Sequence, residues 1–331
     1  MARTGLRPLL LALLGLAALT GGTHALAAGS DRTLPNLALP TLGGSQLWAD
    51  LAYEGGWRVQ RHVWTGHARL LDENNVRRAW GSKAACLEAL RDHAKVVEDQ
   101  ERPVVVVLHG LWRTRRSMSN LAGSFRGAGY EVIDVTYPSA RASIEEHAAQ
   151  VAGLLDRLSG TDREVSFVTH SLGALVTRQL LAREGDAWRG RHRVHRAVFI
   201  APPNRGARLA EIGRKVPLLS WIYGEPMRQI AGGFARELAG PGIPFATIAG
   251  GCGDGEGWNP LIPGDDDGVV AVAETRLRGA AGELVVRRLH TTIMKDPAAI
   301  DAAVEFIQRG VFPASGAAAT GTAPAAPKRS R

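Results

Sequence analysis

Ser171 lies where a buried strand gives way to an amphipathic helix, in the segment VSFVTHSLGALVTRQLL at residues 165–181. A sharp strand-to-helix turn exposes a serine hydroxyl above a sheet edge and places it at a helix N-terminus, where negative charge is favoured. The neighbouring positions must be small, and the usual pattern is Gly-x-Ser-x-Gly. Here residues 169–173 read THSLG, so the first glycine is missing. The segment predicts a nucleophile elbow in which Thr169 brings extra atoms to the strand side.

The chain resembles the lipase and esterase branch of the α/β-hydrolase family, in which His-Ser-Leu-Gly is a frequent form of this elbow. The resemblance covers about residues 100–310 and includes VVVVLHGLW at 104–112 and APPNRGARLAE at 201–211, where Ala207 replaces a frequent serine. It implies a serine hydrolase that cleaves carboxylic esters through an acyl-enzyme. It also implies a triad in the chain order Ser, Asp, His.

His290 is the histidine that this order requires, because no other histidine follows His195 and it stands directly after the predicted strand LVVRRL at 284–289. The alternative is an ordinary surface histidine. For the acid, the resemblance selects Asp267, since the family often carries Asp-Gly-x-Val there and residues 267–270 read DGVV.

Other carboxylates near Asp267 leave alternatives for the acid. Asp266 and Asp254 are both possible, while a solvated acidic turn is the expected state of Asp265 and Asp266. Some relatives hold calcium near this loop, but three adjacent carboxylates do not form a standard calcium-loop spacing. We therefore predict no metal site here.

The oxyanion hole is expected from two backbone N–H groups. One belongs to Leu172, which follows the nucleophile. The resemblance places the other on Leu111, in the His-Gly-Leu sequence after the first buried strand, where Gly110 allows close backbone approach. His109 and His170 are interpreted as structural or hydrogen-bonding neighbours rather than proton carriers.

A long insertion at about 204–242 interrupts the alternation of strands and helices and predicts a short cap. Its apolar segment at 216–223 suits either an acyl or alcohol pocket or plain helical packing. The predicted substrate-binding residues are Trp112, Trp221 and Tyr223. Three arginines stand beside the oxyanion loop, at positions 113, 115 and 116. They predict a charged rim, and the alternative is that they attract an anionic substrate.

The elements that must position these residues alternate strongly after Pro103. The run VVVVL at 104–108 is typical of a strand buried on both faces, and helices and strands follow in turn to a last helix at about 297–309. This pattern predicts an α/β-hydrolase fold with a mostly parallel sheet covered on both faces. A small antiparallel meander from Trp57 and a helix from Ser82 are assigned to the N-terminal edge of the same domain, residues 57–312.

The ends of the chain have different compositions. Residues 1–27 carry two arginines, an apolar run from Leu9 to Leu19 and a small-residue site, which predict a signal peptide and hence an exported, periplasmic or extracellular protein. No later run is long enough to cross a membrane. Residues 28–56 are predicted as a lead-in segment, and 313–331 as a disordered low-complexity tail. Without five cations in the leader and tail, the net charge falls from +8 to +3, which does not favour nucleic-acid binding.

Cys86 and Cys252 are the two cysteines of the chain; an exported protein could oxidise them to a disulfide, whereas the helical pattern around Cys86 favours a buried thiol. No cofactor is predicted. The expected partner is a small-molecule or lipid ester, with the oligomeric state left open. An acyltransferase, a thioesterase or an exported binding module without turnover would use the same fold.

Overall fold

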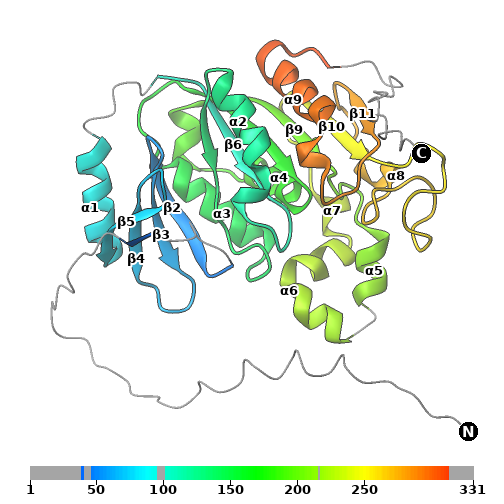
Figure 1. Cartoon of the computed structure of the whole chain (residues 1–331), viewed down its shortest axis with the longest axis horizontal. Helices are drawn as coiled ribbons and strands as arrows, with labels where there is room; N and C mark the ends of the chain where they lie inside the picture. Colours follow the sequence, from blue (N-terminus) through cyan, green and yellow to red (C-terminus); the bar gives the residue numbers. More distant parts are fainter. Residues whose placement is uncertain (1–38, 41–45, 95–100, 215–216, 313–331) are drawn as a thin grey trace, which may run out of the picture. The chain divides into compact units, whose positions relative to one another are not determined.

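The alternating elements predicted after Pro103 build one parallel sheet (Figure 1). The computed structural model describes residues 39–40, 46–94, 101–214 and 217–312, so the predicted leader and C-terminal tail lie outside the described residues. The sheet order is β11-β10-β9-β8-β6-β7, and each neighbouring pair is parallel. Its strands are β6 (Val104–Leu108), β7 (Glu131–Asp134), β8 (Glu164–His170), β9 (Arg193–Ile200), β10 (Phe245–Gly250) and β11 (Glu283–Val286).

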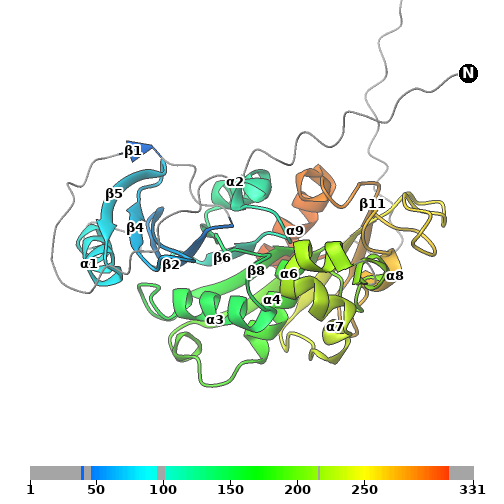
Figure 2. The same cartoon turned by 90° about the horizontal axis from the view of Figure 1, so that it is seen from below.

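Helices cover both faces of this sheet (Figure 2). Strand β6 shows the reason, because all five of its residues are buried and successive side chains enter opposite cores. One core holds α3 and α4, and the other holds α2 and α9. The protein therefore has the predicted α/β-hydrolase fold. The helices are α2 (Ser119–Gly127), α3 (Ile144–Leu155), α4 (Leu172–Ala182) and α9 (Pro297–Arg309).

The caps of α3 and α9 explain where these helices begin and end. Ser143 and Glu146 form a reciprocal capping box at the start of α3. At α9 the Asp296 side chain accepts a backbone N–H of the first turn and Pro297 occupies the first helical position. Gly310 ends α9 in the left-handed conformation, with a φ of 72°.

A second, antiparallel sheet precedes the parallel one, in the order β1-β5-β4-β3-β2. Its strands include the antiparallel meander predicted at the N-terminal edge of the domain, and they form a sheet of their own. The lead-in prediction is wrong for part of its range, because β2 falls within residues 28–56 and pairs with β3. The elements are β1 (Leu39–Pro40), β2 (Trp48–Glu54), β3 (Trp57–His62), β4 (Ala68–Leu71), β5 (Val76–Gly81) and α1 (Lys83–Ala94).

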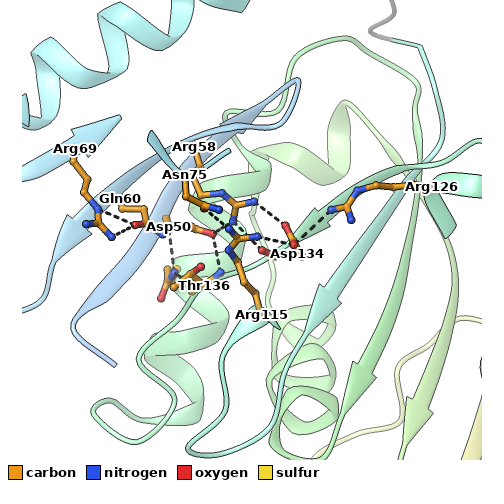
Figure 3. A network of polar contacts seen from close by, with 10 residues as sticks. Asp50, Arg58, Gln60, Arg69, Asn75, Arg115, Arg126, Asp134 and Thr136 are labelled. Atoms are coloured by element: carbon orange, nitrogen blue, oxygen red, sulfur yellow. Dashed lines mark hydrogen bonds and ion pairs between the residues drawn. The ribbon is translucent and has the colours of Figure 1, made fainter. Parts of the chain in front are cut away.

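A buried polar network joins the two sheets (Figure 3). The Arg58 guanidinium on β3 lies 3.0 Å from the Asp50 carboxylate and 2.7 Å from that of Asp134 at the end of β7. Arg115 also binds Asp134, at 2.9 Å, and the Thr136 N–H donates to Asp50 at 2.7 Å. Because breaking one partner of a buried pair leaves the other charge uncompensated, this network holds the antiparallel sheet against the parallel one.

The predicted cap insertion folds into three helices between β9 and β10. They are α5 (Arg208–Arg214), α6 (Pro217–Ala231) and α7 (Phe234–Glu237). Gly224 kinks α6 with a φ of 71°, and a Cβ there would lie 2.1 Å from the Ala140 carbonyl oxygen. Gln229 ties the same helix to the start of α3 by accepting the Ile144 N–H at 2.8 Å. The remaining short elements are α8 (Val272–Thr275) and the 3-10 turns Arg115–Met118, Ala187–Gly190 and Ile293–Lys295.

Candidate active site

Ser171 occupies a strained turn between β8 and α4. Its φ of 54° and ψ of −121° lie outside the regions that non-glycine residues favour. The turn is tight because two glycines let neighbouring segments approach. A Cβ on Gly173 would lie 2.8 Å from the Leu108 carbonyl oxygen, and one on Gly110 would lie 3.0 Å from the Ser171 Cβ. These close approaches hold the serine at the carboxyl end of the sheet.

Thr169 stands where the elbow pattern has its first glycine. It is fully buried on β8, in register with Leu108 of β6 and Phe199 of β9. Its hydroxyl has no hydrogen-bond partner within the described part of the chain. A buried hydroxyl without a partner costs about 1–3 kcal/mol. The elbow thus retains its geometry with a larger residue at this position, at a cost in stability.

Ser171, His290 and Asp267 lie in series. The Ser171 Oγ is 3.0 Å from the His290 Nε2, and the His290 Nδ1 is 2.7 Å from the Asp267 Oδ2. The His290 backbone N–H also donates to the Asp267 carbonyl oxygen at 2.8 Å. With a proton on Nδ1 facing the carboxylate, Nε2 is free to accept the proton of the serine hydroxyl. The three side chains are about nine-tenths buried or more.

The Asp267 carboxylate is held by the turn that follows it. Its Oδ1 accepts the N–H groups of Val269 at 3.0 Å and Val270 at 2.8 Å, which leaves Oδ2 for His290. These bonds fix the orientation of the carboxylate. Asp254, an alternative acid in the sequence analysis, instead accepts the N–H groups of Glu256 and Gly257.

The predicted solvated acidic turn is wrong. Asp266 is fully buried and its Oδ1 accepts the N–H groups of Gly268 at 2.6 Å and Asn259 at 3.1 Å. Asp265 accepts the N–H groups of Cys252 at 2.6 Å and Gly253 at 3.0 Å. Both carboxylates therefore accept backbone N–H groups of the glycine-rich loop at 251–268, and Asp266 is withdrawn from solvent.

His170 and His109 are buried behind this series. The His170 Nε2 lies 3.0 Å from the His290 carbonyl oxygen, so its N–H donates to the backbone of the histidine beside the nucleophile. Burial lowers the pKa of His170 well below 6.5 and that of His109 to about 4, which keeps both rings neutral near pH 7. His109 stacks on Tyr137 with ring centroids 4.3 Å apart. The positions agree with their interpretation as hydrogen-bonding neighbours.

Leu111 and Leu172 line the cavity beside Ser171. Leu172 is the first residue of α4, where a backbone N–H has no intrahelical acceptor. The Leu111 N–H has no hydrogen-bond acceptor among the described residues. Its loop forms a turn closed by the Arg113 N–H and the Gly110 carbonyl at 3.1 Å, with Trp112 at a φ of 56°. Both predicted donors are thus available beside the serine.

A cavity of about 470 Å³ opens above Ser171. Its wall is mostly apolar. The insertion predicted as a cap contributes side chains from α5 and α6 to this wall. Trp112 lines the cavity and is 45% exposed, and its substrate-binding role stays a prediction. Trp221 and Tyr223 fall on α6, but their side chains lie outside the described residues. The principal cap residues of the wall are Leu209, Ile212, Met227 and Ile230.

Arg178 supports the cap, a role that no sequence pattern predicted. It lies two turns after Ser171 on α4, is 1% exposed, and has no carboxylate partner among the described residues. Its guanidinium donates to Asn204 at the start of the insertion and to the carbonyls of Leu238 and Ala239 near its end. Burial lowers its pKa to about 10. A basic residue within an amphipathic helix carries no sequence signal for this role.

The described residues offer no group of three or more metal-ligating side chains, and no helix among them is long and apolar enough to cross a bilayer. Cys86 and Cys252 are both free. Cys86 packs in the core between α1 and the antiparallel sheet, and burial raises its pKa to about 11. The predicted buried thiol is therefore what this structure contains, and the disulfide is not formed in it.

The profile of a family described as "Domain of unknown function (DUF7379)" matches residues 73–231. A comparison with curated proteins finds no match. Among solved structures, the mature lipase BlEst2 of Bacillus licheniformis is similar at 19% identity and a TM-score of 0.46, over 60% of this chain and 89% of that one. A hydrolase of Oleispira antarctica, olei00960, has 14% identity, a TM-score of 0.41 and coverages of 63% and 92%. A thioesterase domain from the curacin biosynthetic pathway has 13% identity and a TM-score of 0.41, over 79% of this chain and 98% of that one.

Proposed function

We propose that the protein is a serine hydrolase that cleaves carboxylic esters through an acyl-enzyme. The observation that carries this proposal is the hydrogen-bonded series from the Ser171 Oγ through His290 to Asp267, which ends in an apolar cavity. A serine alcohol is a weak nucleophile unless an adjacent base accepts its proton. The buried imidazole, oriented by a carboxylate, meets that requirement.

In the proposed reaction the Ser171 Oγ attacks the ester carbonyl while the His290 Nε2 takes the hydroxyl proton. The N–H groups of Leu111 and Leu172 stabilise the oxyanion of the tetrahedral intermediate. Its collapse breaks the bond to the alcohol oxygen, which leaves with the proton from His290. Water then attacks the acyl-enzyme by the same route and releases the acid. Asp267 holds the imidazole tautomer and favours the transient imidazolium.

The cavity suits an apolar substrate group, because its volume of about 470 Å³ lies beside Ser171 and its wall is mostly apolar. The cap residues Leu209, Ile212 and Met227 suit the apolar acyl portion.

The leader-like residues 1–27 support the further proposal that the protein is exported, which mass spectrometry of the mature N-terminus tests.

A fluorophosphonate probe, followed by mass spectrometry, tests the mechanism. The folded wild type should be labelled on Ser171, and Ser171→Ala should lose both the label and hydrolysis of p-nitrophenyl butyrate and octanoate. Ser124→Ala is the matched control, because Ser124 is exposed on α2 and bonds only the Asn120 carbonyl. An unlabelled folded wild type, or full turnover by Ser171→Ala, would refute the proposal.

A further inference from the structure

Three arginines near the oxyanion loop have different surroundings, although the sequence groups them. Arg115 binds Asp134 at 2.9 Å within the polar network between the sheets. Arg116 is exposed and lines a separate hollow with Arg58. Arg113 lines the cavity above Ser171. One of the three cations is therefore placed where a substrate would lie.

Arg113 has no carboxylate partner among the described residues. Its recorded side-chain hydrogen bond is to the Thr291 carbonyl oxygen, at 3.3 Å. It is also the one formally charged side chain that the described residues contribute to the cavity wall, which is otherwise largely apolar. A guanidinium carries five N–H donors in a planar fork that matches carboxylate and phosphate groups. Its remaining donors are thus available to an anion in the cavity.

The position of Arg113 relative to His290 identifies the part of the substrate that it meets. In ester cleavage His290 returns its proton to the alcohol oxygen, so the alcohol portion must lie against this imidazole. Arg113 bonds the carbonyl of Thr291, the next residue along the chain. The guanidinium thus contacts the segment that carries the base, whereas the cap residues of α5 and α6 provide an apolar wall without charge.

We infer that the preferred esters carry an anionic group, a carboxylate or a phosphate, on their alcohol portion, and that Arg113 recognises it. This inference rests on the proposed ester hydrolysis. Arg113 acts by binding the substrate and takes no part in proton transfer. We expect the loss of Arg113 to change KM and kcat/KM. The effect should weaken with salt, because the side chain is partly exposed to solvent.

Matched esters test the inference. The pentanoyl ester of p-hydroxybenzoate is compared with that of methyl p-hydroxybenzoate, and p-phosphonooxyphenyl pentanoate provides the phosphate arm. In Arg113→Gln the ratio of kcat/KM for anionic over neutral esters should fall by roughly fivefold to tenfold. Arg113→Lys should keep part of the ratio. Arg116→Gln, which removes the same charge from the neighbouring hollow, should keep all of it.

Each contrary result identifies what failed. An unchanged ratio in Arg113→Gln, or an equal loss in Arg116→Gln, would overturn the assignment of charge recognition to Arg113. If Arg113→Gln instead loses its preference for the p-nitrophenyl monoester of adipic acid over p-nitrophenyl hexanoate, the alcohol-side assignment is wrong. An equal fall in kcat/KM for neutral and anionic esters in Arg113→Gln would also overturn the assignment of charge recognition to Arg113. Fluorophosphonate labelling of Ser171 in each variant reports separately on the proposed hydrolase.

Discussion

Lowering the pH from 7 to 5 should destabilise the folded protein through its buried histidines. His147 and His109 are each 1% exposed, and burial is the main cause that lowers the pKa of each to about 4 from an ordinary 6.5. The unfolded chain binds a proton at each of these residues as the pH falls below about 6.5, while the folded chain binds it only near pH 4. Stability is therefore present above pH 6.5 and is lost as the pH falls toward 4.

The magnitude follows from these pKa values. Integrating the difference in bound protons between pH 7 and pH 5 gives about 2 kcal/mol for each histidine, or about 4 kcal/mol for the pair. His170 acts in the same direction, since burial also lowers its pKa. A typical domain unfolds with about 5–15 kcal/mol, so the loss removes a large share of the total.

Urea unfolding followed by tryptophan fluorescence, at pH 7 and pH 5, measures the effect. His147→Phe isolates one residue, because Phe retains a ring against Tyr137, whose centroid is 4.9 Å away, and cannot titrate. The variant should lose about 2 kcal/mol less between the two pH values than the wild type. Any constant cost of the substitution cancels in this difference. Equal losses in both proteins would refute the reasoning that burial keeps His147 neutral.

Three further substitutions test the site. Asp267→Asn should lower kcat by about a thousandfold or more, because the imidazole of His290 loses its orienting carboxylate; an equal effect of Asp254→Asn would contradict this assignment. His170→Phe removes the donor to the His290 carbonyl and should lower kcat by roughly tenfold with little change in KM. His170→Gln should restore part of the rate, and an unchanged kcat and pH profile in His170→Phe would exclude a positioning role. Arg178→Met should lower the free energy of unfolding by about 2–4 kcal/mol and raise KM for octanoate esters more than for butyrate esters; unaltered thermal unfolding would show that the cap does not depend on this residue.

Local patterns predicted the parallel part of the fold well. The run at 104–108 became β6, buried on both faces, and the last helix has the predicted bounds of 297–309. Such elements are readable because their periodicity and caps lie within a few residues of each other. Strand β2 was missed within the predicted lead-in. Its order depends on β3 and on contacts such as the bond of the Asp50 N–H to the Thr136 carbonyl, far away in the chain.

The same distinction applies to the candidate site. Ser171 has a local signal in its strand, turn and helix, and the chain order of the family located His290 and Asp267, which the structure places in hydrogen-bond series. Asp266 was misjudged as a solvated residue. It is buried because the loop at 251–268 folds around it and presents backbone donors, and no charge pattern in the sequence reports that enclosure.

The sequence by itself determined the buried strands, the amphipathic helices and the chemical groups of the site, because these depend on side-chain type and short-range spacing. Tertiary structure alone decided the surroundings of each charged side chain. It enclosed Arg178 between the two ends of the cap, paired Arg115 with Asp134, and placed Arg113 on the cavity wall beside Thr291. Similar arginines differ in this way because burial and partners come from segments distant in the chain. Around Ser171, the strained elbow and its neighbours exist only once those segments pack together.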